Sequence, residues 1–193
     1  MPLPAFDFPF APWRLSGTVV GALLNHAAEL AALGEAAHRP PHKAPPAAPV
    51  LEVKPRHTLA GDGDAVRLPP DAAEGALLQT GAQLAIVIGR RAKNVSPERA
   101  AAHIFGYSCA NDITAMELLQ RDPSFAQWTR AKNFDGFGVF GPVIATGLDI
   151  ASLRVRTLVN GRERQNFACS AMIFSAAQIV SALSHGITLL PGD

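Results

Sequence analysis

The chain has 193 residues, of which 48% are hydrophobic and 17% are charged. That length and composition are typical of one globular domain with a sizeable core, and they exclude an intrinsically disordered chain. The formal net charge of +1 argues against a general nucleic-acid binder and against electrostatic attachment to an anionic membrane.

The sequence also indicates where the protein works. Residues 1–13 are rich in Pro and Phe and lack the charged region and apolar run of a signal peptide. No apolar run approaches the roughly 20 residues needed to cross a bilayer. Cys109 and Cys169 have no metal-binding or redox spacing, so they are interpreted as free thiols in a reducing compartment. We therefore expect a cytoplasmic protein.

The first half of the chain predicts short elements separated by glycine and proline. We expect strands at residues 15–24 and 50–54, a helix at 25–33 ended by Gly34, and a turn at 61–64. Between Gly34 and the second strand lies a proline-rich stretch, which excludes a regular helix or a central strand and predicts a long loop.

The second half predicts further short elements. The apolar run at residues 84–88 indicates a strand buried on both faces. Helices are expected from Ser96 to about Phe105, from after Asp112 to before Pro123, and after a capping box at Ser175. Asn160-Gly161, after an alternating run at 153–159, predicts a β-hairpin with a type I′ turn. The pattern as a whole favours an α+β, β-dominated domain over a doubly wound sheet.

Several common catalytic motifs are absent from the sequence. It contains no GxGxxG, no GxxxxGK[ST], no GxSxG and no HExxH. Nicotinamide, P-loop, serine-hydrolase and zinc-protease functions therefore have no support.

A family resemblance rests on an ordered set of sequence blocks. They are LAIVIGRRAKNV at 84–95, FGYSCAND at 105–112, QWTRAKNFD at 127–135 and Gly141-Pro142, with weaker similarity at 50–55 and 172–193. In this order and spacing they resemble the core of the fumarylacetoacetate hydrolase family. We expect an N-terminal extension at 1–16 and a catalytic domain of this family at 17–193, without the strand and loop with which the family normally continues.

The resemblance implies a fold and a chemistry. The fold would be a mixed β-sandwich roll with a few short helices. The activity would be keto–enol isomerisation, decarboxylation or C–C hydrolysis of a 2-oxo or 2-hydroxydienoic dicarboxylate in aromatic catabolism. The alternative is a non-catalytic or metal-independent partner of a metal-binding paralogue. The resemblance further implies a homodimer or a pair with a paralogous chain. From the net charge and the short apolar runs, we expect no nucleic-acid or membrane partner.

The resemblance also implies a divalent cation, Mg²⁺ or Mn²⁺. The family holds it with a Glu-x-Glu pair and an Asp; the Asp matches Asp112, whereas the pair falls on Gly81 and Gln83. Asp112 and Gln83 are therefore the candidate ligands, a weakened set for a cation that prefers carboxylate oxygens. Asp112 could instead cap a helix. Glu52 and Glu117 are the candidates to replace the missing carboxylates.

Two lysines match lysines of the family. Lys54 and Lys132 would stabilise the carboxylate or enolate oxygen of a substrate as positive charges; the alternative is two surface lysines. Arg130 and Asp135 would orient Lys132, contact the substrate or form a structural ion pair. Gln120 is a further substrate-binding candidate.

His26 and Glu29 are the candidates for proton transfer. They lie three residues apart on an expected helix, so their side chains could meet on one face. The family pattern is Asn-Tyr-x-x-His-x-x-Glu, whereas His26 here directly follows Asn25. Either three residues are deleted and His26 and Glu29 form the family's acid–base pair, or His26 replaces the tyrosine and the pair is absent. The second interpretation needs no gap.

Overall fold

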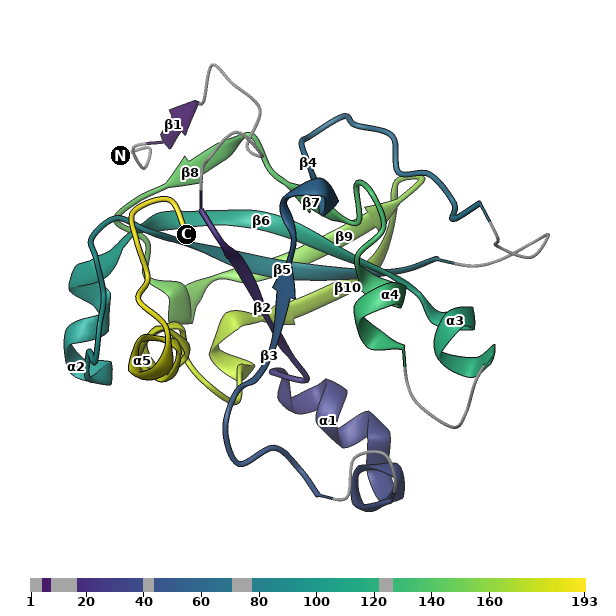
Figure 1. The fold of residues 1–193 in the computed structure, drawn as a ribbon, viewed down its shortest axis with the longest axis horizontal. Coiled ribbons are helices and arrows are strands. Elements are labelled where there is room, and N and C mark those ends of the chain that lie inside the picture. Colours follow the sequence, from purple (N-terminus) through teal and green to yellow (C-terminus); the bar gives the residue numbers. More distant parts are fainter. Residues whose placement is uncertain (1–4, 8–16, 40–43, 71–77, 122–126) are drawn as a thin grey trace.

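A computed structural model describes residues 5–7, 17–39, 44–70, 78–121 and 127–193. Figure 1 shows the fold, in which short helices surround a long pair of strands. Three expectations fall partly outside the described residues. These are the start of the strand expected at 15–24, part of the proline-rich loop at 40–43, and the helix end before Pro123.

The largest sheet is built around two long antiparallel strands, β5 and β6. They pair along the whole of β5, and Gly81 lies opposite Asp112. The strand order is β1-β8-β6-β7-β4, with β5 also paired to β6. Its strands are β1 (Ala5–Asp7), β4 (Leu59–Ala60), β5 (Leu78–Ile88), β6 (Ile104–Ala115), β7 (Gly138–Phe140) and β8 (Val143–Ala145). β1 thus comes from the segment expected to be an extension.

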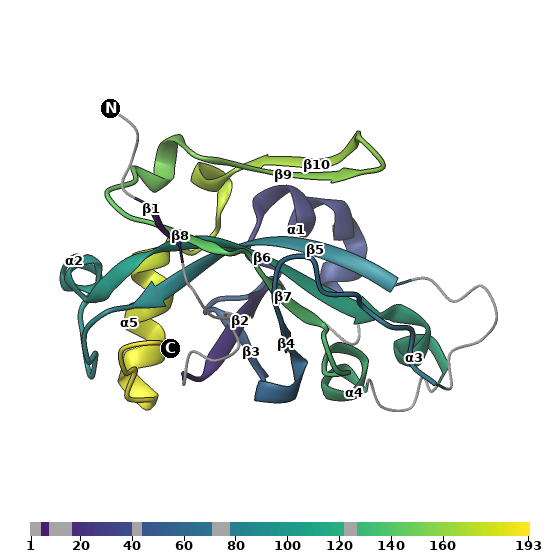
Figure 2. The ribbon, with the colours of Figure 1, turned by 90° about the horizontal axis from the view of Figure 1, so that it is seen from above.

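Two separate two-stranded sheets lie on either side of the β5–β6 pair. One contains β2 (Val19–Leu23) and β3 (Val50–Lys54), and the other β9 (Arg154–Val159) and β10 (Arg162–Ala168). Figure 2 shows β9–β10 along one side of the long pair and β2–β3 on the other. Asn160 and Gly161 have φ angles of 51° and 73°, which confirms the type I′ hairpin turn.

The helices are short, as the α+β, β-dominated prediction requires. They are α1 (Ala27–Leu33), α2 (Pro97–Ala100), α3 (Met116–Arg121), α4 (Trp128–Lys132) and α5 (Ala176–Gly186), with 3₁₀ turns at Gly34–His38, Arg56–Thr58, Ala101–His103, Ile150–Ser152 and Cys169–Ala171. The capping box at Ser175 and Gln178 is confirmed. No helix in the described part of the chain is long and apolar enough to span a membrane.

Two hydrophobic clusters hold these elements together. The first joins α2 and α5 to the end of β5, through Ile88, Ala92, Val95, Ala100, Val180, Leu183 and Leu189. The second joins β6 to α3 and α4, through Ile113, Ala115, Leu118, Ala131 and Phe137. The second cluster fixes α4 against β6 and therefore sets the position of Lys132, the last residue of α4.

Three local predictions were wrong, two of them because strand pairing overrides local helix signals. The helix expected to reach Phe105 ends at Ala100, followed by a 3₁₀ turn, and β6 begins at Ile104. Asp112 lies inside β6 and caps no helix; α3 begins only at Met116. The strand expected at 84–88 begins at Leu78, and only Ile88 within it is buried, because β5 borders the cavity described below.

Phe137 is the buried side chain on which the second cluster depends, since it is 0% exposed. We expect Phe137→Ala to lower the free energy of unfolding by about 3–5 kcal/mol, because it leaves a cavity beneath α4. The measurement is urea denaturation followed by circular dichroism. Phe105→Ala is the matched control, because Phe105 is 43% exposed, and it should cost below about 1 kcal/mol. Equal losses in both variants would contradict this account of the core.

Candidate active site

The site is centred on Asp112, a carboxylate in the middle of β6. The side chain is only 7% exposed. Its partners on the two neighbouring strands are both glycines, Gly81 on β5 and Gly138 on β7. A Cβ on Gly138 would lie 3.6 Å from Cδ of Lys54. The glycine neighbours therefore leave room beside Asp112 for side chains from other elements.

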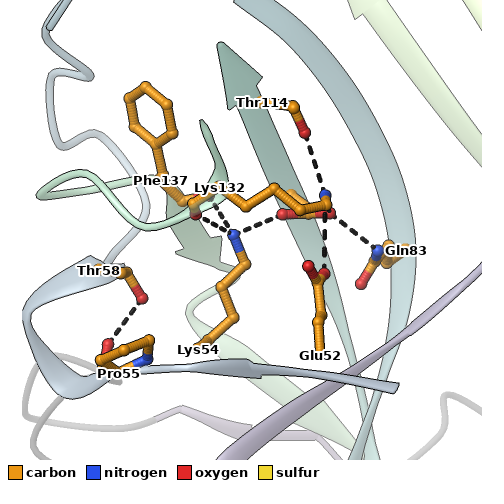
Figure 3. A network of polar contacts seen from close by, with 9 residues as sticks. Glu52, Lys54, Pro55, Thr58, Gln83, Thr114, Lys132 and Phe137 are labelled. Atoms are coloured by element: carbon orange, nitrogen blue, oxygen red, sulfur yellow. Dashed lines mark hydrogen bonds and ion pairs between the residues drawn. The ribbon is translucent and has the colours of Figure 1, made fainter. Parts of the chain in front are cut away.

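Two buried lysines fill that space, each 5% exposed. Lys54, the last residue of β3, places Nζ 2.5 Å from Oδ1 of Asp112. Lys132, the last residue of α4, donates to Oδ2 of Asp112 and lies 3.0 Å from the hydroxyl of Thr114. Figure 3 shows Lys54 and Lys132 converging with Thr114, Glu52 and Gln83. The alternative that the lysines lie on the surface is wrong.

The two ammonium groups differ in how many of their three donors are already used. Besides Asp112, Nζ of Lys54 contacts the carbonyl oxygens of Lys132 at 2.7 Å and Phe137 at 3.4 Å. The ion pair and the two hydrogen bonds hold this ammonium group in place, and they tie β3 to α4. Lys132 contacts Asp112 and Thr114, and its next neighbour is Oε1 of Glu52 at 3.6 Å, which is too long for a hydrogen bond. Lys132 therefore keeps one donor for a ligand.

Glu52 brings a second carboxylate to this cluster. It lies two residues before Lys54 on β3, so strand alternation puts both side chains on one face. Its cross-strand partner is Gly21 of β2, where a Cβ would lie 2.7 Å from Oε1 of Glu52. Burial, and next the negative charge of Asp112, raise the pKa of Glu52 to about 6, although Lys132 and Lys54 act in the opposite direction.

The donor set does not fit the divalent cation that the resemblance implies. Gly81 has no side chain, and Gln83 presents its amide Nε2 to Oδ2 of Asp112 at 3.5 Å. Both oxygens of Asp112 face ammonium groups. Among the residues that the structure describes, no three His, Cys, Asp or Glu side chains are grouped as metal ligands. Glu117, the other candidate, pairs with Arg121 at 3.3 Å instead.

The cluster opens into a large cavity of about 1430 Å³. Lys132, Lys54, Glu52, Asp112 and Gln83 all line it, together with residues of β2, β3, β5 and β6. Ligand pockets for small molecules usually measure roughly 300–1,000 Å³. The cavity thus has ample room for a dicarboxylic acid beside the lysines.

The proposed acid–base residues have other local roles. Nδ1 of His26 accepts from the backbone N–H of Ala28 at 3.3 Å, so His26 is the N-cap of α1. The His26 ring also packs edge-on against Phe167, with ring centroids 5.0 Å apart. Glu29 is exposed on α1, although both residues line the cavity. The capping bond engages Nδ1 of His26, and its buried Nε2 has no hydrogen-bond partner in the described structure, so His26 and Glu29 do not form a hydrogen-bonded pair.

The remaining candidates lie near α3 and α4. Arg130 and Asp135 are exposed, whereas Lys132 is buried and contacts Asp112, Thr114 and Glu52. The side chain of Gln120 lies outside the described part of the structure. Sequence reasoning gave no role to Thr114 or Gly21, and it considered Glu52 only as a replacement ligand. The signal for Glu52 was its two-residue spacing from Lys54.

Comparison with known proteins agrees with this architecture. The family profile described as Fumarylacetoacetate (FAA) hydrolase C-terminal matches residues 18–193. The homoprotocatechuate catabolism bifunctional isomerase/decarboxylase of Escherichia coli is 37% identical over 179 residues, which are 93% of this chain and 40% of that protein.

Two solved structures have the same fold. The 5-carboxymethyl-2-hydroxymuconate delta-isomerase from Mycobacterium smegmatis matches with a TM-score of 0.77 at 36% identity, over 93% of this chain and 66% of that one. The 2-hydroxyhepta-2,4-diene-1,7-dioate isomerase from Mycobacterium marinum matches with a TM-score of 0.76 at 37% identity, over 93% of this chain and 62% of that one.

The matches cover nearly all of this chain but less of its relatives. The chain spans 40% of the length of the Escherichia coli enzyme and less than two thirds of the Mycobacterium marinum chain. The family profile nonetheless extends from residue 18 to residue 193 and includes every residue of the Asp112 cluster. The chain belongs to the fumarylacetoacetate hydrolase family.

Proposed function

We propose that this protein is an isomerase of aromatic catabolism that interconverts the keto and enol forms of a 2-oxo or 2-hydroxydienoic dicarboxylate. The observation that carries the proposal is the Lys132 ammonium group. It is buried, held by Asp112 and Thr114, and has one donor left for a ligand in the cavity. The two solved relatives described above, both named as isomerases of such compounds, support this substrate class.

The proposed chemistry depends on charge stabilisation. In a keto–enol isomerisation the 2-hydroxyl group loses a proton and a carbon of the resulting enolate gains one, or the reverse, and negative charge gathers on the 2-oxygen in between. A fixed ammonium group in a buried site stabilises that charge much more than water does. Lys132 would contact the oxygen, while Lys54 would position Asp112 and add positive charge. Decarboxylation would pass through a similar enolate.

Isomerisation is favoured over C–C hydrolysis by the state of His26. Hydrolysis needs a base that activates water, and in the resemblance that base comes from a His–Glu pair. Here that pair is not formed: Nδ1 of His26 caps α1, its Nε2 has no hydrogen-bond partner in the described structure, and Glu29 is exposed. Isomerisation needs no activated water, so the groups around Lys132 meet more of its requirements.

A Mg²⁺ or Mn²⁺ ion bound at Asp112 would act as a Lewis acid on the 2-oxo oxygen. Because the donor set does not fit such an ion, we assign no step to it. The non-catalytic alternative is not favoured, because both lysines are in place around Asp112 and the relatives are named as enzymes.

The proposal extends to assembly and location. We place the protein in the cytoplasm, as a homodimer or paired with a paralogous chain of the family. The exposed apolar side chains of Val50, Leu51 and Val53 on β3, beside the cavity, support a protein neighbour at this edge.

The first test removes the charge of Lys132. Lys132→Met should lower the turnover of 5-carboxymethyl-2-hydroxymuconate by about 10²–10³-fold, because the developing negative charge loses its donor. Turnover is followed by ultraviolet absorbance, and circular dichroism verifies the fold. Lys93→Met is the matched control, since Lys93 is exposed and outside the cluster. Unchanged turnover in Lys132→Met would refute the assigned role.

The second test separates the two roles of His26. His26→Asn replaces one N-cap residue by another and removes the imidazole. If His26 only caps α1, the variant should keep its melting temperature and its turnover, whereas His26→Ala should lose about 1 kcal/mol of stability. A folded His26→Asn variant without turnover would instead show that His26 transfers a proton.

A further inference from the structure

We infer that the cavity binds its 2-oxo acid without a divalent cation, with the ammonium groups of Lys132 and Lys54 supplying the positive charge. This inference rests on the proposed function, and it sets the protein apart from the metal-dependent chemistry that the family resemblance implies. Four observations support it. Both oxygens of Asp112 face lysines, and β5 carries no second carboxylate beside Asp112. Glu52 comes from β3, and the charges of the cluster sum to zero.

The only carboxylate that this chain shares with the family's metal ligands is already paired. Lys54 lies 2.5 Å from Oδ1 of Asp112, and Lys132 donates to Oδ2. A metal ion bound to either oxygen would lie beside an ammonium group that is 95% buried. The ammonium group of Lys54 could not move far from the ion, since it is also bonded to two carbonyl oxygens.

β5 offers no replacement carboxylate beside Asp112. A Cβ on Gly81 would lie 3.9 Å from Cβ of Asp112, so a side chain at position 81 would reach the carboxylate. This chain has none there. Gln83 reaches Asp112, but with its amide Nε2 at 3.5 Å. The amide thus donates to the carboxylate, and Gln83 brings no second negative charge to this position.

Glu52 approaches from β3, and its carboxyl group lies close enough to that of Asp112 to interact with it directly. It stands on β3, in the space left by Gly21, and its nearest ammonium group is that of Lys132 at 3.6 Å. Glu52 and Asp112 together supply two carboxylates, one fewer than the three of the family pattern, and both face the ammonium group of Lys132. Among the described residues, no three carboxylate, imidazole or thiol groups gather around one point.

The charge of the cluster is balanced as it stands. Lys54 and Lys132 carry two positive charges, and Asp112 and Glu52 carry two negative charges, so the sum is zero. A divalent cation bound in the absence of substrate would leave an excess of two positive charges in a buried site and would face two ammonium groups. Charges in a buried site are weakly screened, so that excess is unfavourable.

Metal binding by the protein itself is measured with Mn²⁺ by electron paramagnetic resonance, without substrate. We expect the wild-type protein to bind no Mn²⁺ up to about 1 mM. The positive comparison is Gly81→Glu combined with Gln83→Glu, which restores both family carboxylates and should bind Mn²⁺ in the micromolar range. A Cβ at position 81 would lie 3.2 Å from a backbone oxygen of Asp112, a close contact that could disturb folding of the double variant. Gln83→Glu alone is therefore the second variant. Micromolar binding by the wild type would overturn the inference.

Binding of a substrate-like anion is measured with oxalate, a dianion that resembles the enolate of a 2-oxo acid. Calorimetric titration is done once in EDTA and once in Mg²⁺. Equal affinity in both solutions is the expected result. Oxalate binding that requires Mg²⁺ would overturn this inference alone and leave the proposed function standing. Absence of oxalate binding in both solutions would count against the proposed function and, with it, against the inference.

Discussion

The organisation of this protein depends on one buried carboxylate, Asp112, held between two ammonium groups. Removing a charge from water is costly, and that cost is offset only when each oxygen of the carboxylate has a well-placed cationic partner. Asp112 meets this requirement with Lys54 on Oδ1 and Lys132 on Oδ2. Loss of any member would leave an uncompensated charge, so the three side chains form a single unit.

The surrounding elements are arranged to bring this unit together. β6 carries Asp112 and Thr114, β3 carries Lys54, and α4 carries Lys132. The bonds from Lys54 to the carbonyl oxygens of Lys132 and Phe137 fasten the β2–β3 sheet to α4. The hydrophobic cluster around Phe137 holds α4 against β6. The second hydrophobic cluster therefore sets the position of the Lys132 ammonium group, although that group lines the cavity.

The residues by which the chain differs from the family pattern change the charge around Asp112. Gly81 and Gln83 replace the expected pair of glutamates, which removes two negative charges beside Asp112. Glu52 returns one negative charge from β3, where Gly21 leaves space for it. The result is a neutral cluster of two lysines and two carboxylates. Such a cluster can attract an organic anion through Lys132, but it lacks the oxygen ligands that a hard cation prefers.

The sequence predicts the fold of this protein better than it predicts the contacts within the site. The blocks from residue 84 to residue 142 were sufficient to indicate the family, and through it the strand-rich fold. The hairpin turn at Asn160-Gly161 and the capping box at Ser175 could be predicted, because both depend on backbone geometry within a few residues. The helix expected to reach Phe105 could not, because β6 forms by pairing with β5 and β8, which are distant in sequence.

The sequence by itself determined the family, the two lysines, Asp112 and the loss of the glutamate pair, because these are matters of residue identity in an ordered pattern. Only the tertiary structure decided what these residues do to one another. It placed Glu52 opposite Gly21, engaged the donors of Lys54, left one donor on Lys132, and gave His26 a capping role. These outcomes join residues up to 83 positions apart, as in the pair Lys54 and Phe137. Burial and electrostatic partners at that separation arise from packing of the whole fold, which no local pattern encodes.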